Sequence, residues 1–144
     1  MTIDRPLAEL LPHAGRMRLI DRVVSCDGER IVCEADSHRA PDHPLAIDGK
    51  LAAACGLEYG AQAMAIHGAL AAGRRERPRL GYLAAAHELI WQVERLDTLD
   101  APLTIEAERE FGSDNRVSYA FTIRAGTREV MRGRASVVLC AASR

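Results

Sequence analysis

The sequence predicts an α+β domain in which one antiparallel sheet wraps around a single long central helix. Its 144 residues suit one domain, which we expect to span residues 1–144 with a core that needs neither disulfides nor metals. A long apolar segment without proline, residues 51–72, is typical of a helix. Short runs with period two lie on both sides of it, and such strands need only one partner for their apolar face.

The first predicted elements form a hairpin. Residues 17–25 and 30–35 are short, partly β-branched runs, and the residues between them include Asp27-Gly28, a strong hairpin signal. Residues 36–50 then lose all periodicity and carry two prolines and several aspartates, which indicates an irregular loop. Two histidines, His38 and His43, lie within it.

The predicted helix runs from Leu51 to about Ala72. Of the chain's 24 alanines, ten fall between residues 46 and 72, so the helix is slim enough for a sheet to close around it. Glu58, Gln62 and His67 in its interior argue against a membrane span. We therefore expect a helix that is buried nearly all round inside the domain.

Four strands are expected after the helix. The first covers residues 80–93. Residues 103–111 and 117–123 alternate apolar and polar side chains, and Phe111 falls on the apolar side while Arg109 interrupts it. Turn residues follow both segments, and the last strand ends near Cys140.

The overall charge and the cysteines exclude several classes of function. Nineteen basic residues oppose twenty acidic ones, so the chain lacks the basic excess of a nucleic-acid-binding protein. The four cysteines form no CxxC pair and we find no secretory leader, so a reducing cytoplasm is the expected setting. Because His38, Asp42 and His43 lack a recognised metal-ligand spacing, we expect no metal and no other cofactor.

Glu58 stands in the middle of the most apolar segment. Gln62 is four residues on, hence on the same helix face one turn later. Isolated burial of a charge costs several kcal/mol, so two polar groups on one stripe suggest a polar pocket. Burial raises the pKa of a carboxyl group, which suits a general acid. The alternative is a carboxylate that caps or forms an ion pair at a subunit contact.

A histidine in the preceding loop is the candidate partner for this acid. His43 lies fifteen residues before Glu58, and His38, five residues earlier, stays open as an alternative. His67 falls on the opposite helix face from Glu58, and we expect it to be structural. No histidine of known proximity supports Cys55 as a nucleophile.

The charged segment 74–79 (RRERPR) follows the predicted helix. We interpret it as a solvated surface loop. As an alternative, its arginines would attract an acidic carrier protein.

Three motifs resemble one known family. Residues 10–13 (LLPH) and 17–23 (MRLIDRV) resemble the opening of the hotdog-fold 3-hydroxyacyl-acyl-carrier-protein dehydratases. Residues 55–63 (CGLEYGAQA) resemble their helix, in which an acidic residue is followed four positions later by glutamine. The resemblance is greatest to the predicted dehydratases of aryl-polyene and xanthomonadin-like pigment pathways.

The resemblance implies a cytoplasmic homodimer, or a higher assembly of dimers, that dehydrates a 3-hydroxyacyl thioester of acyl carrier protein or coenzyme A. Glu58 matches the family's acid. His43 is the best match to the histidine, which the other subunit usually contributes. Backbone N–H groups at the helix N-terminus, near Gly49 to Ala53, would polarise the thioester carbonyl. We expect Gly49, Gly56 and Gln62 to bind the substrate.

Two rival functions remain open on the same fold. In a thioesterase, Glu58 would activate water or attack the carbonyl carbon directly. In a non-catalytic subunit, the chain would pair with a related, active hotdog dehydratase. The residues 42–46 (DHPLA), which differ from the family's Gly-His-Phe-Pro-Gly loop around the histidine, favour this second rival.

Overall fold

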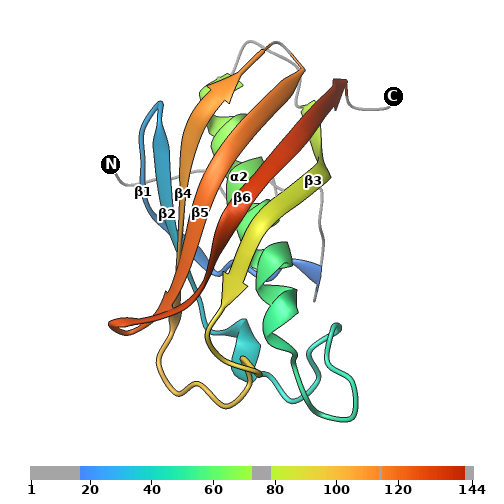
Figure 1. Cartoon of the computed structure of the whole chain (residues 1–144), viewed down its shortest axis with the longest axis vertical. Coiled ribbons are helices and arrows are strands. Elements are labelled where there is room, and N and C mark those ends of the chain that lie inside the picture. Colours follow the sequence, from blue (N-terminus) through green and yellow to red (C-terminus); the bar gives the residue numbers. More distant parts are fainter. Residues whose placement is uncertain (1–16, 73–78, 114, 142–144) are drawn as a thin grey trace.

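The structure, a computed structural model, describes residues 17–72, 79–113 and 115–141. Six strands form one fully antiparallel sheet in the order β1-β2-β4-β5-β6-β3, and the long helix α2 packs against one face of it. Figure 1 shows α2 behind the curved sheet, with β1 and β3 at the two edges. The predicted α+β architecture is therefore confirmed. The strands are β1 (Arg22–Cys26), β2 (Arg30–Ala35), β3 (Arg79–Trp91), β4 (Leu103–Gly112), β5 (Arg116–Ala125) and β6 (Arg128–Ala141).

The predicted hairpin is formed by β1 and β2. Asp27 Oδ1 accepts the backbone N–H groups of Glu29 and Arg30, and the Asp27 N–H donates to the Arg30 carbonyl, which closes the turn. The first strand is shorter than predicted, since residues 17–21 are not part of it. Leu19 explains the difference, because its N–H donates to the Gln62 side chain on α2 instead of to a strand.

The helix α2 (Gly56–Ala72) begins five residues later than predicted. The Leu51 N–H donates to Asp97 Oδ1 (2.9 Å), and the Leu51 carbonyl accepts the Leu96 N–H (2.8 Å). Ala52 forms a bridge with Arg95, and a short 3-10 helix (Ala53–Cys55) leads into α2. Contacts with the loop after β3 therefore hold residues 51–52 extended, in spite of their helix-favouring composition.

None of residues 56–70 is exposed, and eight of the fifteen are buried while seven are partly buried, so one side of the helix is less covered than predicted. Two glycines allow α2 to approach the sheet closely. A Cβ atom at Gly60 would lie 3.0 Å from Cδ2 of Phe121 on β5, and one at Gly56 would lie 2.9 Å from Sδ of Met131 on β6. The slim helix expected from the composition is thus seen at its contacts with these two strands.

The predicted alternation holds along β5 and the first half of β4, where every second side chain is buried. It fails at Phe111, which is 69% exposed although the pattern places it on the apolar side. A register shift between Arg109 and Phe111 in the pairing with β5 moves this ring out of the core.

Candidate active site

Glu58 and Gln62 lie on successive turns of α2, as the spacing predicts. Gln62 Nε2 lies 3.3 Å from Glu58 Oε1 and donates to it. Glu58 is half-buried and Gln62 is fully buried. The structure therefore brings the two polar groups together on one stripe of the helix.

Gln62 also anchors the segment before β1. Its Oε1 accepts the Leu19 N–H (2.8 Å), and its Nε2 donates to the Met17 carbonyl (2.7 Å). These bonds satisfy backbone groups that would be costly to bury unpaired. The predicted role of Gln62 in substrate binding stays a prediction.

His43 is buried in the loop between β2 and α2. Its Nε2 lies 3.1 Å from the hydroxyl of Tyr59, and its Nδ1 accepts the Leu45 N–H (3.0 Å). Burial lowers the pKa of His43, the nearby His38 lowers it further, and Asp42 opposes the shift. His43 is therefore neutral at neutral pH, and it contacts the helix residue next to Glu58.

Tyr59 and Ser37 complete this cluster, and the sequence reasoning missed both. The Tyr59 hydroxyl lies 2.7 Å from Ser37 Oγ, which donates to the Leu19 carbonyl (2.7 Å). Burial raises the pKa of Tyr59 to about 12, so it remains a neutral phenol. The sequence did contain a signal for this cluster, namely a tyrosine inside an apolar helix, because a buried phenol needs a hydrogen-bond partner.

The other described histidines lie in three different environments, and His38 stays a predicted alternative to His43. His38 is fully buried; its Nε2 donates to the Leu99 carbonyl (3.0 Å), and burial lowers its pKa. His67 is bonded to the Tyr119 hydroxyl (2.7 Å) and the Asp27 carbonyl (2.8 Å), away from Glu58, as predicted. His87 lies exposed on β3.

The prediction that N–H groups of residues 49–53 bind the thioester carbonyl needs correction. The Lys50 N–H donates to the Ile47 carbonyl (3.0 Å), and the Ala53 N–H donates to the Glu94 carbonyl (2.9 Å). The Leu51 N–H donates to the Asp97 carboxylate, so these three N–H groups are already bonded within the chain. Gly49 belongs to a tight turn, where its φ of 73° suits glycine. Because α2 starts at Gly56, the positive end of the helix lies there. The binding roles of Gly49 and Gly56 stay predictions.

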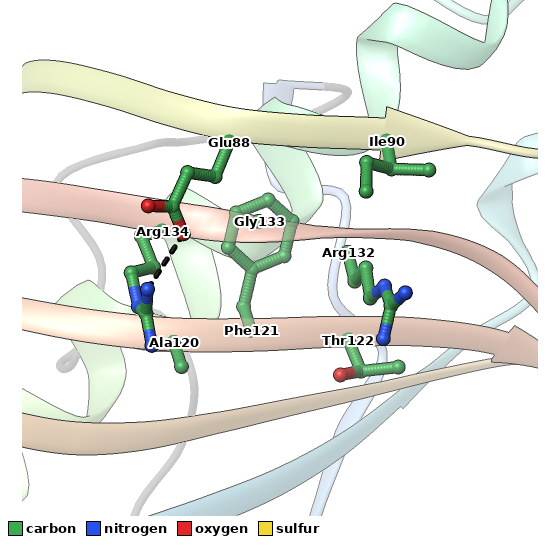
Figure 2. Close-up of a pocket in the computed structure, with 8 residues that line it drawn as sticks. All are labelled: Glu88, Ile90, Ala120, Phe121, Thr122, Arg132, Gly133 and Arg134. Carbon is green, nitrogen blue, oxygen red and sulfur yellow. Dashed lines mark hydrogen bonds and ion pairs between the residues drawn. The ribbon is translucent and has the colours of Figure 1, made fainter.

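A shallow pocket of about 350 Å³ lies elsewhere, on β3, β5 and β6. Figure 2 shows Arg134 paired with Glu88 (2.6 Å) at one end of it, and Arg134 also bonds to Glu110 (3.0 Å). None of the predicted site residues lines this pocket. Its lining residues are Glu88, Ile90, Ala120, Phe121, Thr122, Arg132, Gly133 and Arg134.

Two further observations concern only the described residues. Within residues 17–72, 79–113 and 115–141, no group of three or more His, Cys, Asp or Glu side chains is arranged to hold a metal ion. In the same part of the chain, no helix has the length and apolarity needed to cross a membrane. The motif at residues 10–13 and the charged residues 74–78 lie outside the described residues.

The chain matches one protein-family model and resembles several solved structures. The ApeP-like family model, described as ApeP dehydratase, matches residues 5–142. The dehydratase heterocomplex ApeI:P from Xenorhabdus doucetiae has a similar structure, with a TM-score of 0.82 and 23% identity over 94% of this chain and 91% of that chain. AziG from S. sahachiroi is also similar, with a TM-score of 0.66 and 16% identity over 92% and 99% of the two chains.

A hypothetical thioesterase with coenzyme A from Streptococcus pneumoniae TIGR4 shares the fold as well. Its TM-score is 0.59, and it is 12% identical over 85% of this chain and 88% of that chain. The comparison with curated proteins found no match. The structural similarities confirm the predicted hotdog fold.

Proposed function

Because the chain belongs to the ApeP-like dehydratase family, we propose that it removes water from a 3-hydroxyacyl thioester to give the trans-2-enoyl thioester. The proposed substrate is carried on acyl carrier protein in a fatty-acid-like or aryl-polyene pigment pathway of the cytoplasm. The observation that carries the proposal is the pair Glu58 and Gln62 on a buried helix, with a neutral, buried histidine in the adjoining loop.

Each step of the reaction has a group suited to it. Neutral His43 takes the proton from the carbon next to the thioester carbonyl. The carboxyl group of Glu58 is the proposed donor of a proton to the leaving hydroxyl. Each of these transfers contributes roughly 100- to 10,000-fold to the rate. The positive end of the α2 dipole, at Gly56, stabilises the negative charge that develops on the carbonyl oxygen.

The proposal includes a second hotdog subunit beside β3. This edge strand pairs with β6 alone among the described strands. Leu83 and Trp91 lie opposite the buried residues Val137 and Met131, so they face the helix side of the sheet, yet they are 41% and 50% exposed. Apolar side chains that face the core side of an edge strand without a cover favour a partner subunit there. We expect that partner to be a second copy of the chain.

Changing Leu83 to glutamate is expected to shift the protein from dimer to monomer. The new charge would be desolvated at the proposed subunit contact, which costs several kcal/mol. Analytical ultracentrifugation over a concentration series measures the shift. Val24→Glu is the matched control, because Val24 is 47% exposed on β1, at the opposite edge of the sheet. Equal dimerisation of Leu83→Glu and the wild type would place the subunit contact elsewhere.

Thioester turnover tests the proposed reaction directly. The purified protein is incubated with 3-hydroxyacyl and enoyl thioesters of acyl carrier protein and of coenzyme A, and the mass of each is followed. We expect a loss or gain of 18 Da, the mass of one water, with the thioester intact. Release of free thiol would favour the thioesterase, and no change with any chain length would refute the dehydratase acting alone.

A non-catalytic partner subunit is the second candidate. It is favoured by the bonds of His43, whose two ring nitrogens both have partners within the chain. The similarity to one chain of a dehydratase heterocomplex also supports it. If His43→Asn leaves turnover unchanged while the protein co-purifies with a related hotdog chain, this candidate replaces the first.

A further inference from the structure

A continuous chain of hydrogen bonds runs from the loop residue Leu45 to the backbone of Leu19. It passes through the side chains of His43, Tyr59 and Ser37, with donor-to-acceptor distances of 3.0, 3.1, 2.7 and 2.7 Å. Both ends of the chain are backbone groups. A backbone N–H can only donate and a backbone carbonyl can only accept, so the direction of every bond between them can be worked out.

The Leu19 carbonyl, at one end of the chain of bonds, determines where the hydroxyl protons of Ser37 and Tyr59 point. Because the Leu19 carbonyl can only accept, the Ser37 O–H donates to it. Ser37 Oγ must then accept from the Tyr59 O–H, since the single proton of Ser37 is already used. The Tyr59 oxygen is therefore left to accept a hydrogen bond from the Nε2–H group of His43.

The amide end leads to the same assignment independently. The Leu45 N–H donates to Nδ1 of His43, so this nitrogen carries no proton. The ring is neutral, so its one proton lies on Nε2 and points to Tyr59. Reversing the chain would place two donors against each other at Leu45 and would take the Ser37 donor away from the Leu19 carbonyl, which is costly.

The burial and the neighbours of Tyr59 and His43 favour this placement of the protons. Tyr59 is completely buried and stays protonated, so it supplies an uncharged oxygen to the ring. His43 is also buried, and of the charged or titratable groups that act on its ring, His38 opposes protonation and Asp42 favours it. The hydroxyls of Tyr59 and Ser37 thus orient a ring that burial keeps neutral.

We propose that Tyr59 is a positioning residue that, together with Ser37, holds the proton of His43 on Nε2 and leaves Nδ1 as the nitrogen that accepts the substrate proton. The assignment of Nδ1 as acceptor rests on the proposed dehydratase function. The Leu45 N–H occupies Nδ1 in the free protein, so this contact opens when the substrate is in place. Tyr59 then stabilises the imidazolium by accepting its Nε2–H.

The proton and electron balance of the step is complete. The carbon–hydrogen bond next to the carbonyl breaks, its proton goes to Nδ1, and its electron pair forms the enolate. The pair then forms the carbon–carbon double bond as the carbon–oxygen bond breaks. The carboxyl proton of Glu58 joins the leaving oxygen to give water. The proton on Nδ1 returns to the Glu58 carboxylate through solvent, which restores both groups.

The ring nitrogens of His43 can be observed without any substrate. In protein labelled with ¹⁵N-histidine at about pH 8, above the ordinary histidine pKa, two-bond correlations identify which ring nitrogen carries the proton. The His43 signals are assigned by their loss in His43→Asn. We expect the proton on Nε2, with a slowly exchanging downfield signal. A proton on Nδ1 would overturn the proposal whether or not any thioester is turned over.

The variant Tyr59→Phe tests the positioning role. We expect the Nε2 proton signal to be lost to exchange and kcat to fall roughly 10- to 100-fold with KM little changed. This loss is smaller than the roughly 10,000-fold cost of removing a carboxylate that orients a catalytic histidine, because tyrosine is uncharged. Ser37→Ala is expected to show a smaller effect in the same direction, and Ser37→Thr, which keeps the hydroxyl, is expected to restore the wild-type values.

Tyr119→Phe is the matched control. Tyr119 is equally buried and its hydroxyl also bonds to a buried histidine, His67, but this pair lies away from Glu58. We expect Tyr119→Phe to destabilise the protein without changing kcat or the His43 spectrum. Equal losses of kcat in the two tyrosine variants, or unchanged kcat in Tyr59→Phe, would overturn the positioning role. Absence of turnover in the wild type would refute the proposed function instead, and the Nε2 assignment would still be decided by the spectrum.

Discussion

Replacing Glu58 by glutamine is expected to lower kcat for dehydration by roughly 100- to 10,000-fold, the range for losing a general acid. The glutamine amide has nearly the shape of a protonated carboxyl group but cannot release a proton to the leaving hydroxyl. The substitution keeps an oxygen for the bond from Gln62 Nε2, so the packing of α2 is retained. The measurement is steady-state turnover of the thioester that the wild type uses.

Glu108→Gln controls for the loss of a negative charge. Glu108 lies exposed on β4, on the face of the sheet away from α2. Both variants are expected to keep the wild-type circular dichroism spectrum and melting temperature, and only Glu58→Gln is expected to lose turnover. Full activity of a folded Glu58→Gln protein would remove this carboxyl group from the mechanism.

Replacing Phe121 by alanine is expected to lower the free energy of unfolding by about 3–5 kcal/mol, the usual cost of emptying a buried phenylalanine site. The ring is 2% exposed and fills the space between β5 and α2, where it lies against Gly60. Because Gly60 has no side chain to move into the cavity, the site cannot refill from the helix. Chemical denaturation followed by circular dichroism gives the free energy of unfolding.

Phe111→Ala makes the same chemical change on the surface. Its ring is 69% exposed beyond the register shift in β4, so we expect its free energy of unfolding to stay within about 0.5 kcal/mol of the wild-type value. The two phenylalanines therefore compare core with surface directly. A loss below about 1 kcal/mol for Phe121→Ala would show that α2 does not pack on this ring as described.

Eighteen of the nineteen basic residues are arginines, and the fold gives several of them an ion-pair partner. Arg22 pairs with Glu34, Arg30 pairs with Glu106 on the neighbouring strand, and Arg134 lies between Glu88 and Glu110. Exposed pairs of this kind contribute only about 0–1 kcal/mol each. Their pairing depends on strand order, which the composition does not reveal.

Local patterns predicted most of the fold, and in the candidate site they predicted Glu58, Gln62 and His43 but missed Tyr59 and Ser37. Alternation with period two located β4 and β5, and Asp27-Gly28 located the first turn, because both signals act within a few residues. Glu58 and Gln62 were placed together by helical spacing alone. The pattern was wrong at Phe111, where the pairing with the neighbouring strand shifts by one residue.

The sequence by itself therefore determined the element order, the buried helix and the polar stripe on it, since each depends on the geometry of one segment. Only the tertiary structure decided where α2 begins, because Asp97 and Leu96 hold Leu51 from 45 or more residues away. It also decided that His43 meets the Tyr59 hydroxyl, which in turn bonds to Ser37. Those contacts join a loop and a helix, and no local periodicity encodes how two such segments pack.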